Sequence, residues 1–268
     1  MLRVELIRAL RRWRTYVLGA GLAGIPILIV VSLKLSSNDP LAAATGPAFL
    51  GKILVNGLFA PLSALAVIQP FFLPLGAGLL SGDAVAGEAS AGTLRYLLVR
   101  PVGRIRLIID KYAFVMLSVI AGVVWVVAVG LVAGGAAYGV GPMPTLSGTT
   151  MSAAQAVLRI VAAGAYMVGG VAGIAAIGLF ISTLTDSAPG AAIAPVAVAI
   201  VSQILDNIDS LRVIHPFLIS HRWLAWTDLF RSPVEWGGMA RGALTFAIYT
   251  AVFLGAALRA FVRRDVTS

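Results

Sequence analysis

The chain has 268 residues, of which 59% are hydrophobic and only 12% are charged. Soluble domains carry about a quarter of charged residues, so a chain this apolar needs lipid as part of its solvent. Its formal net charge of +9 is better explained by Lys and Arg in cytoplasmic loops than by nucleic acid, and we expect no nucleic-acid partner. Because the chain has no Cys, disulfides, thiolate metal sites and a cysteine nucleophile are excluded.

Six stretches are apolar enough to cross a bilayer, for which roughly 20 mostly apolar residues are needed. They are residues 15–35, 53–80, 112–138, 153–184, 189–205 and 242–260. The second and fourth are longer than one bilayer requires, so they must tilt, kink or project into water. The sequence therefore predicts an all-α membrane protein with six transmembrane helices, formed as a single transmembrane domain over residues 1–268.

Residues 1–14 precede the first span and are strongly basic. Apolar side chains fall on one helical face of this arm and most of the arginines fall elsewhere. A basic amphipathic helix with Trp at its apolar edge lies in the membrane interface, and we favour this over a plain positive anchor, which would not need the apolar stripe. The following apolar run is long enough to span and has no clear cleavage site, so we expect the arm to be retained.

Basic residues also determine the expected orientation. They gather in the arm, in the connection between the second and third spans, and in the C-terminal tail, where they are Arg259, Arg263 and Arg264. Six spans place these three segments on one side, which the positive-inside rule makes cytoplasmic. We therefore expect a multi-pass protein of the plasma (inner) membrane with both termini in the cytoplasm.

Prolines are unevenly placed: Pro61, Pro70 and Pro74 lie in the second span, and Pro189 and Pro195 begin the fifth. Proline removes a helix hydrogen bond and kinks the helix. Two interpretations stay open. In the first, the prolines only fit over-long helices into the bilayer; in the second, they mark helices that line a substrate pathway.

Arg159 is the one basic residue well inside a predicted span. A charge within the membrane is a functional hypothesis by default. Because Arg159 lies only about two helical turns from the outer end, snorkelling of its side chain is favoured, and a substrate contact is the alternative.

The fourth span is rich in small residues, among them Gly164, Gly170 and Gly173. Small residues let helices approach closely. We expect this span to pack tightly against other helices or a second subunit.

The sequence lacks the motifs of several kinds of enzyme, metal site and carrier. There is no G-x-x-x-x-G-K-[ST] motif, so the chain cannot hydrolyse ATP by itself and is not expected to be an enzyme. The only histidines, His215 and His221, have Asp228 nearby, but their spacing fits no standard zinc pattern, and we expect no metal site. Acidic residues are missing from the six span cores, which argues against a secondary carrier.

The connection between the second and third spans is unusual because it is polar, basic and patterned. Read as a helix, residues 83–98 put apolar side chains on one side, while Glu88 and Arg95 face elsewhere. Pro101 stops this helix, and a turn leads to Lys111 and the third span.

This pattern resembles the first cytoplasmic loop of ABC type-2 exporter permeases, in which an acidic residue precedes Gly-Thr-Leu and is followed by Pro, Arg and Lys. The residues that carry the resemblance are Gly87, Glu88, Gly92, Thr93, Leu94, Arg100, Pro101, Arg104 and Lys111. The resemblance implies that residues 81–111 form a cytoplasmic coupling loop whose coupling helix contacts an ATPase subunit. Alternatively, the basic residues merely obey the positive-inside rule.

The resemblance implies further features of an exporter. Residues 1–14 would be the interfacial elbow helix, and residues 206–241 an outer loop with short re-entrant helices. Two ATPase subunits would pair with this permease and a second permease chain, identical or paralogous, with ATP and Mg²⁺ bound by the ATPases and no cofactor on this chain. Proline-containing spans would line the route of a hydrophobic or amphipathic substrate such as a drug, lipid or lipid-linked glycan. The alternatives are a non-transporting scaffold or sensor with the same fold, or a secondary carrier.

Overall fold

The computed structural model describes residues 13–35, 49–92 and 103–263, together with Glu5, Ile7 and Arg11. The long elements are the helices α2 (Trp13–Leu35), α4 (Phe59–Ile68), α5 (Phe72–Ser90), α7 (Arg104–Tyr138), α8 (Ala153–Leu184), α9 (Ala188–Asp206) and α10 (Trp236–Arg263). The short elements are the 3-10 helices η1 (Leu50–Leu54), η2 (Asp209–Leu211), η3 (His215–Phe217) and η4 (Trp223–Phe230), and the antiparallel strands β1 (Met143–Pro144) and β2 (Thr150–Met151). The chain is mostly helical, as the sequence predicted.

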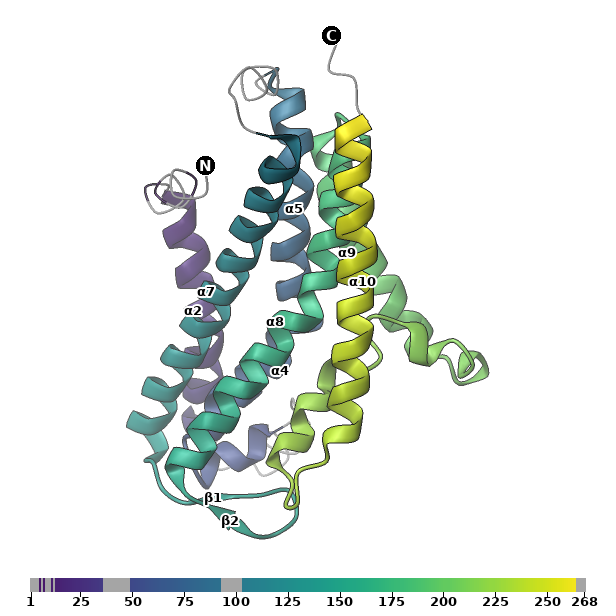
Figure 1. Ribbon diagram of the computed structural model, residues 1–268. Helices are drawn as coiled ribbons and strands as arrows, with labels where there is room; N and C mark the ends of the chain where they lie inside the picture. The colour runs from purple at the N-terminus through teal and green to yellow at the C-terminus, as the bar shows by residue number, and fades with distance from the viewer. Residues whose placement is uncertain are drawn as a thin grey trace.

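The helices form an elongated bundle in which α8 passes through the middle (Figure 1). Helices α2 and α7 lie on one side of α8, and α9 and α10 lie on the other. The start of α2, the start of α7 and the end of α10 lie together at one end of the bundle, called the termini end below. The hairpin of β1 and β2 lies at the opposite end, which is called the hairpin end.

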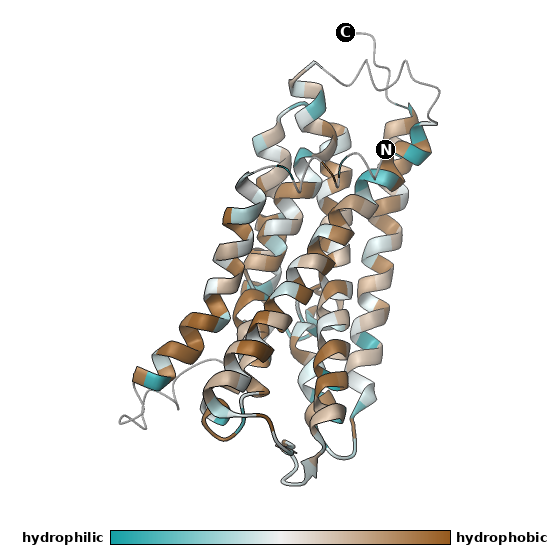
Figure 2. Cartoon of the chain, turned by 90° about the vertical axis from the view of Figure 1, so that its left-hand side faces the viewer, coloured by the Kyte–Doolittle hydropathy of each residue, from teal (hydrophilic) through white to brown (hydrophobic). Residues whose placement is uncertain are grey.

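Within the described residues, five helices are long and apolar enough to cross a membrane, namely α2, α7, α8, α9 and α10. Helices α4 and α5 would together make a sixth span if this pair, bent by 53°, is counted as one. Large apolar side chains such as Val132 (73% exposed) and Leu158 (70% exposed) point away from the bundle, and Figure 2 shows hydrophobic residues along the outside of the helices. A surface of this kind belongs in lipid or against another membrane chain.

The second predicted span is broken where α4 ends and α5 begins. Pro70 lies in the break, and its carbonyl accepts a hydrogen bond from Nε2 of Gln203 on α9 at 2.8 Å. The neighbouring Gln69 is buried; its Nε2 donates to the carbonyl of Trp223, and its Oε1 accepts from Nε1 of Trp226, both at 2.8 Å. The polar groups at the break are thus satisfied by other segments of the chain, which a break within a membrane requires.

A separate helix was predicted to begin at Asp83 and to cover residues 83–98. The predicted start is wrong. Residues 83–90 are the last part of α5, because nothing between the span and Asp83 interrupts the helix. The helix ends at Ser90 and a turn follows in which Gly92 has a φ of 66°, a conformation that favours glycine. Residues 93–102 lie outside the described residues, and α7 begins at Arg104.

The close packing predicted for the fourth span is confirmed in α8. In the most apolar 18-residue stretch of α8, 67% of the residues are buried, whereas the corresponding share is 17% in α2 and in α10. A Cβ atom at Gly164 or Gly170 would approach side chains of α7 and of η4 to 3.1 and 3.2 Å, and one at Gly173 would approach Ile219 to 2.7 Å. These glycines therefore let α8 serve as the central helix within one chain.

Candidate functional site

The termini end brings together two residues of the sequence motif, Glu88 and Lys111. Lys111, near the start of α7, makes ion pairs through Nζ with Oε1 of Glu88, near the end of α5, and with Oε1 of Glu5 in the N-terminal arm at 2.6 Å. The side chains of Lys111, Glu88 and Glu5 are 11%, 25% and 23% exposed. We call these three residues the Glu5–Lys111–Glu88 cluster, and it joins three segments of the chain.

Partial burial makes this cluster more consequential than an exposed ion pair. Exposed pairs contribute about 0–1 kcal/mol, whereas removing one partner of a buried pair leaves an uncompensated charge at a cost of up to about 3–5 kcal/mol. Loss of the Lys111 amine would leave two carboxylates facing each other. The cluster can therefore hold α5, α7 and the arm in one arrangement.

Arg104, another predicted residue, connects α7 to α10. Its Nη1 donates a hydrogen bond to the carbonyl of Val262 at 3.0 Å, near the end of α10. The last carbonyls of a helix lack intrahelical partners and carry the negative end of the helix dipole, so a guanidinium is a favourable partner there. The start of α7 is thus fixed to α5 on one side and to α10 on the other.

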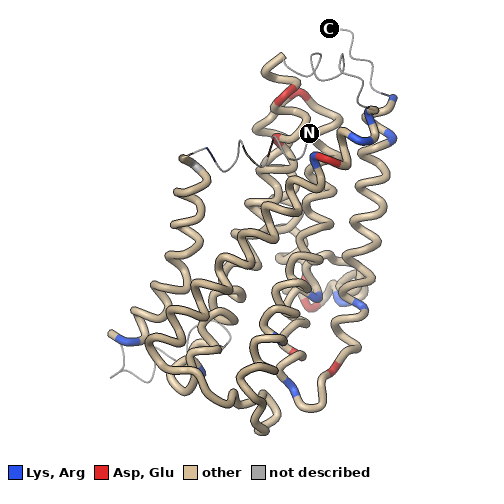
Figure 3. The backbone as a smooth tube through the Cα atoms, turned by 60° about the vertical axis from the view of Figure 1, so that its left-hand side comes forward, with Lys and Arg blue, Asp and Glu red and all other residues tan. Residues whose placement is uncertain are grey.

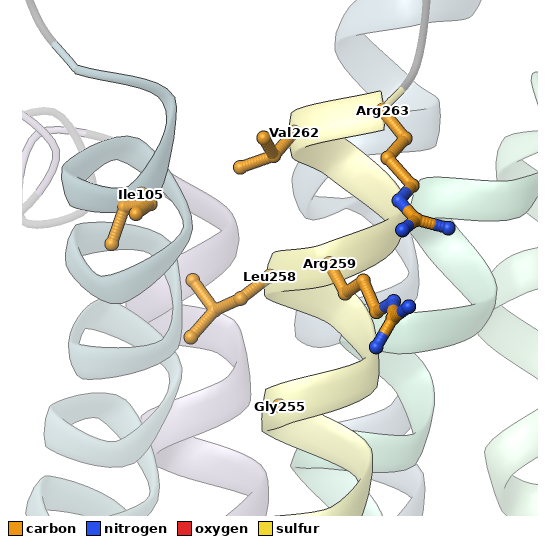
Figure 4. Close-up of a pocket in the computed structure, with 6 residues that line it drawn as sticks. All are labelled: Ile105, Gly255, Leu258, Arg259, Val262 and Arg263. Carbon is orange, nitrogen blue, oxygen red and sulfur yellow. The ribbon is translucent and has the colours of Figure 1, made fainter.

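A cavity of about 310 Å³ lies beside this contact, between α7 and α10. It is lined by Ile105, Gly255, Leu258, Arg259, Val262 and Arg263. Figure 4 shows the side chains of Leu258 and Val262 directed toward the helix that carries Ile105, while Arg259 and Arg263 extend to the other side of α10. Basic residues at this end of α7 and α10 stand out in Figure 3, so the surface of the termini end combines apolar and positively charged groups.

Ser182 of α8 was missed by sequence reasoning, because a lone serine in an apolar span carries no distinguishing signal. Its Oγ donates to the carbonyl of Gly82 at 2.5 Å and accepts from the backbone N–H groups of Val85 and Ala86 at 3.0 and 2.9 Å. These bonds attach the final part of α5 to the central helix. A movement of this part of α5 would therefore also act on α8.

The other residues assigned to the coupling loop fall into two groups. Gly87 and Gly92 are described: a Cβ at Gly87 would overlap the side chain of Asp83, and Gly92 forms the turn after α5. Four residues lie outside the described ones, and they are Thr93, Leu94, Arg100 and Pro101.

The prolines assigned to a substrate pathway are mostly inside the bundle. Pro61 is buried against Gly130 of α7. Pro74 is buried in the first turn of α5, and Pro195 is buried near Gly178 of α8. Pro70 is exposed at the break between α4 and α5. This arrangement favours proline as an adaptation of helix packing, while a pathway along these helices stays a prediction.

Arg159 contacts the chain itself, at the hairpin end. Its Nη1 donates to the carbonyl of Leu229 at 2.6 Å and to the carbonyl of Arg231 at 3.1 Å, where η4 ends. The side chain thus reaches toward the loop, and both snorkelling and a substrate contact stay predictions. Arg159 holds the end of η4 against α8.

The acidic residue beside the two histidines, in the segment between α9 and α10, is not the one that the sequence suggested. Asp228 pairs with Arg231, whose Nε lies 2.9 Å from its Oδ1. Asp206, the last residue of α9, is the carboxylate beside His215 and His221.

Comparisons with known proteins agree with this architecture. The profile of a family described as ABC-2 family transporter protein matches residues 2–266. Two curated relatives, each named "Probable ABC transporter permease protein NosY", from Stutzerimonas stutzeri and Pseudomonas aeruginosa, are 34% identical over 85 residues. These matches cover 32% of this chain and 31% of each relative. Because the family profile extends over nearly the whole chain, this multi-pass membrane protein belongs to the ABC-2 family of transporter permeases.

Proposed function

We propose that this chain is the permease subunit of an ATP-driven exporter and that its termini end receives the ATPase subunits. The observation that carries the proposal is the Glu5–Lys111–Glu88 cluster, which joins the arm, the end of α5 and the start of α7. Residues 93–102, which connect α5 to α7, would contact the ATPase. The family supplies the expectation of an ATPase partner and of a membrane setting.

The contacts around the cluster offer a route for force. A push on the connection reaches α5 and α7 together, because Lys111 and Glu88 hold their ends to each other. It reaches α10 through the bond from Arg104 to Val262, and α8 through Ser182. Displacements at the termini end would thus be passed to helices that extend to the hairpin end.

The remaining features of the proposal come partly from charge and surface, and, for the partners and the outward direction, from the resemblance to exporter permeases. Basic residues at the termini end favour a cytoplasmic location for it, in the plasma (inner) membrane. Two ATPase chains, with ATP and Mg²⁺, would act on this permease and a second permease chain. The apolar bundle suits a hydrophobic or amphipathic substrate, such as a drug, lipid or lipid-linked glycan, moved outward.

The experiment measures ATPase activity of the chain co-purified with its candidate ATPase. Lys111→Met and Glu88→Gln each remove the ion pair between these two residues. Arg106→Gln is the matched control, because Arg106 is also a basic residue near the start of α7 but has an exposed side chain. A coupling free energy of about 1 kcal/mol corresponds to roughly a fivefold effect. We expect at least this loss of permease-dependent stimulation in Lys111→Met and Glu88→Gln, with the complex intact, and little change in Arg106→Gln.

Two other results would contradict the proposal in different ways. Unchanged stimulation in Lys111→Met and Glu88→Gln would mean that the cluster does not transmit force, and the basic residues would then serve topology alone. Failure of the wild-type chain to bind or stimulate an ATPase would instead favour a scaffold, a sensor or a secondary carrier.

A further inference from the structure

The end of α9 and the segment between α9 and α10 bring together three metal-ligating side chains that lie at most 15 positions apart in the chain. One ligand atom from each of Asp206, His215 and His221 lies within 4.8 Å of the others. Asp206 ends α9, His215 begins η3, and His221 lies in the turn before η4. We propose that these three residues form a binding site for a divalent transition-metal ion of the Zn²⁺ class.

The distances between the ligand atoms of this group are close to those in a metal site. Oδ1 of Asp206 lies 2.6 Å from Nδ1 of His221 and 3.8 Å from Nδ1 of His215. Ligands bound to Zn²⁺ at about 2.0–2.2 Å in a tetrahedron are about 3.3 Å apart. These two distances lie on either side of this value, and the ligand atoms of the two histidines lie within 4.8 Å of each other. Shifts of about 0.5–1.5 Å would therefore admit the ion.

The donor set determines the class of ion. Two imidazoles and one carboxylate suit Zn²⁺ and its transition-metal neighbours, whereas Mg²⁺ and Ca²⁺ prefer oxygen ligands alone. Three protein ligands leave a fourth position for water or another molecule, as in open zinc sites. The site would therefore bind an exchangeable ion rather than bury one permanently.

The surroundings orient the ligands. Nε2 of His215 lies 3.2 Å from the carbonyl of Ile208, so an N–H donated there leaves Nδ1 as the atom that faces Asp206. A ligating histidine usually donates its other N–H to a carboxylate or a carbonyl in this way. The hydroxyls of Ser202 and Ser220 lie 2.7 Å apart, and this contact holds α9 to the turn that carries His221.

The position of the site suggests what a bound ion would do. Side-chain exposures of 13% for His215, 22% for Asp206 and 29% for His221 leave the group accessible at one side. An ion would join the end of α9 to the loop that precedes α10. Because this group lies at the end of α9 away from the termini end, ion binding does not depend on the proposed ATPase contact.

The test measures Zn²⁺ binding to the purified chain, carried on an affinity tag that contains no histidine. We expect saturable binding of about one Zn²⁺ per chain and, with Co²⁺ as a spectroscopic probe, visible absorption bands of a low-symmetry N/O site. Mg²⁺ should not compete. The variants are His221→Gln and Asp206→Asn, and the matched control is Asp209→Asn, an exposed carboxylate of the same loop that pairs with Arg212.

The expected effect is a loss of affinity in His221→Gln and Asp206→Asn that exceeds the ~10–100-fold caused by losing an outer partner of a ligand. Asp209→Asn should bind like the wild type. Because His221→Gln could disturb the loop, the wild-type measurement also stands alone. Absence of saturable binding to the wild type, or binding that survives both ligand substitutions, would overturn the proposal.

Discussion

The buried Gln69 offers a sharp test of how the broken span is held together. Gln69→Leu keeps the approximate size of the side chain but removes both hydrogen bonds to η4, the one to the Trp223 carbonyl and the one from Trp226 Nε1. Gln69 and Trp226 are only 1% and 0% exposed, so water cannot replace the lost partner. The indole N–H would be left without an acceptor inside the bundle.

The magnitude follows from these contacts. Leaving a buried donor unsatisfied costs about 1–3 kcal/mol, and losing an ordinary hydrogen bond costs about 0.5–1.5 kcal/mol. Gln69→Leu should therefore lower the free energy of unfolding by about 2–4 kcal/mol. At about 2–4 °C for each kcal/mol in chains of this size, the midpoint of thermal unfolding should fall by roughly 5–15 °C.

The assay is thermal unfolding of the purified chain in one fixed detergent, followed by tryptophan fluorescence. Gln203→Leu is the control, because its bond to Pro70 lies at a more exposed position and should cost only about 0.5–1.5 kcal/mol. In the double variant with Trp226→Phe, which has no indole N–H, the two losses should fall short of additivity by about 1–3 kcal/mol. An unchanged midpoint for Gln69→Leu, or strict additivity, would refute the reasoning.

Three further predictions use the same unfolding assay. Gly82→Ala should lower the free energy of unfolding by about 1–3 kcal/mol, because its Cβ would overlap the backbone of Ala191 on α9. Gly76→Ala, with open space around its Cβ, should leave this free energy unchanged or raise it by up to about 1 kcal/mol. Equal effects of the two substitutions would contradict the packing. Arg159→Met should lose about 1–3 kcal/mol through its bonds to the end of η4, and Arg159→Lys less, so equal losses would argue against a bonding role. Ser182→Ala should cost about 1–3 kcal/mol and reduce ATPase stimulation, whereas full stability would show that its three bonds to α5 are dispensable.

Local chemistry made much of the architecture predictable. The helical content and the candidate spans depend on runs of apolar residues, which are visible without knowledge of neighbours. The close packing of α8 followed from its glycines. Glu88 and Lys111 were both identified through the motif that resembles the first cytoplasmic loop of exporter permeases, but the pattern did not predict that they pair with each other.

The end of α5 shows why boundaries were harder. The polar residues after the second span suggested a new helix at Asp83, but nothing in that stretch breaks a helix, so α5 continues to Ser90. The real break lies earlier, at Gln69 and Pro70. There, η4 and α9 supply the missing hydrogen bonds, and partners more than 130 positions away cannot be read from local pattern.

The sequence by itself determined that this chain is an α-helical membrane protein with a patterned basic loop, because hydropathy and charge act residue by residue. Only the tertiary structure decided that Lys111 meets both Glu5 and Glu88, and that Asp206, rather than Asp228, lies beside the two histidines. Such meetings depend on how each helix is rotated and where it crosses its neighbours. Those quantities are set by the packing of all the helices together.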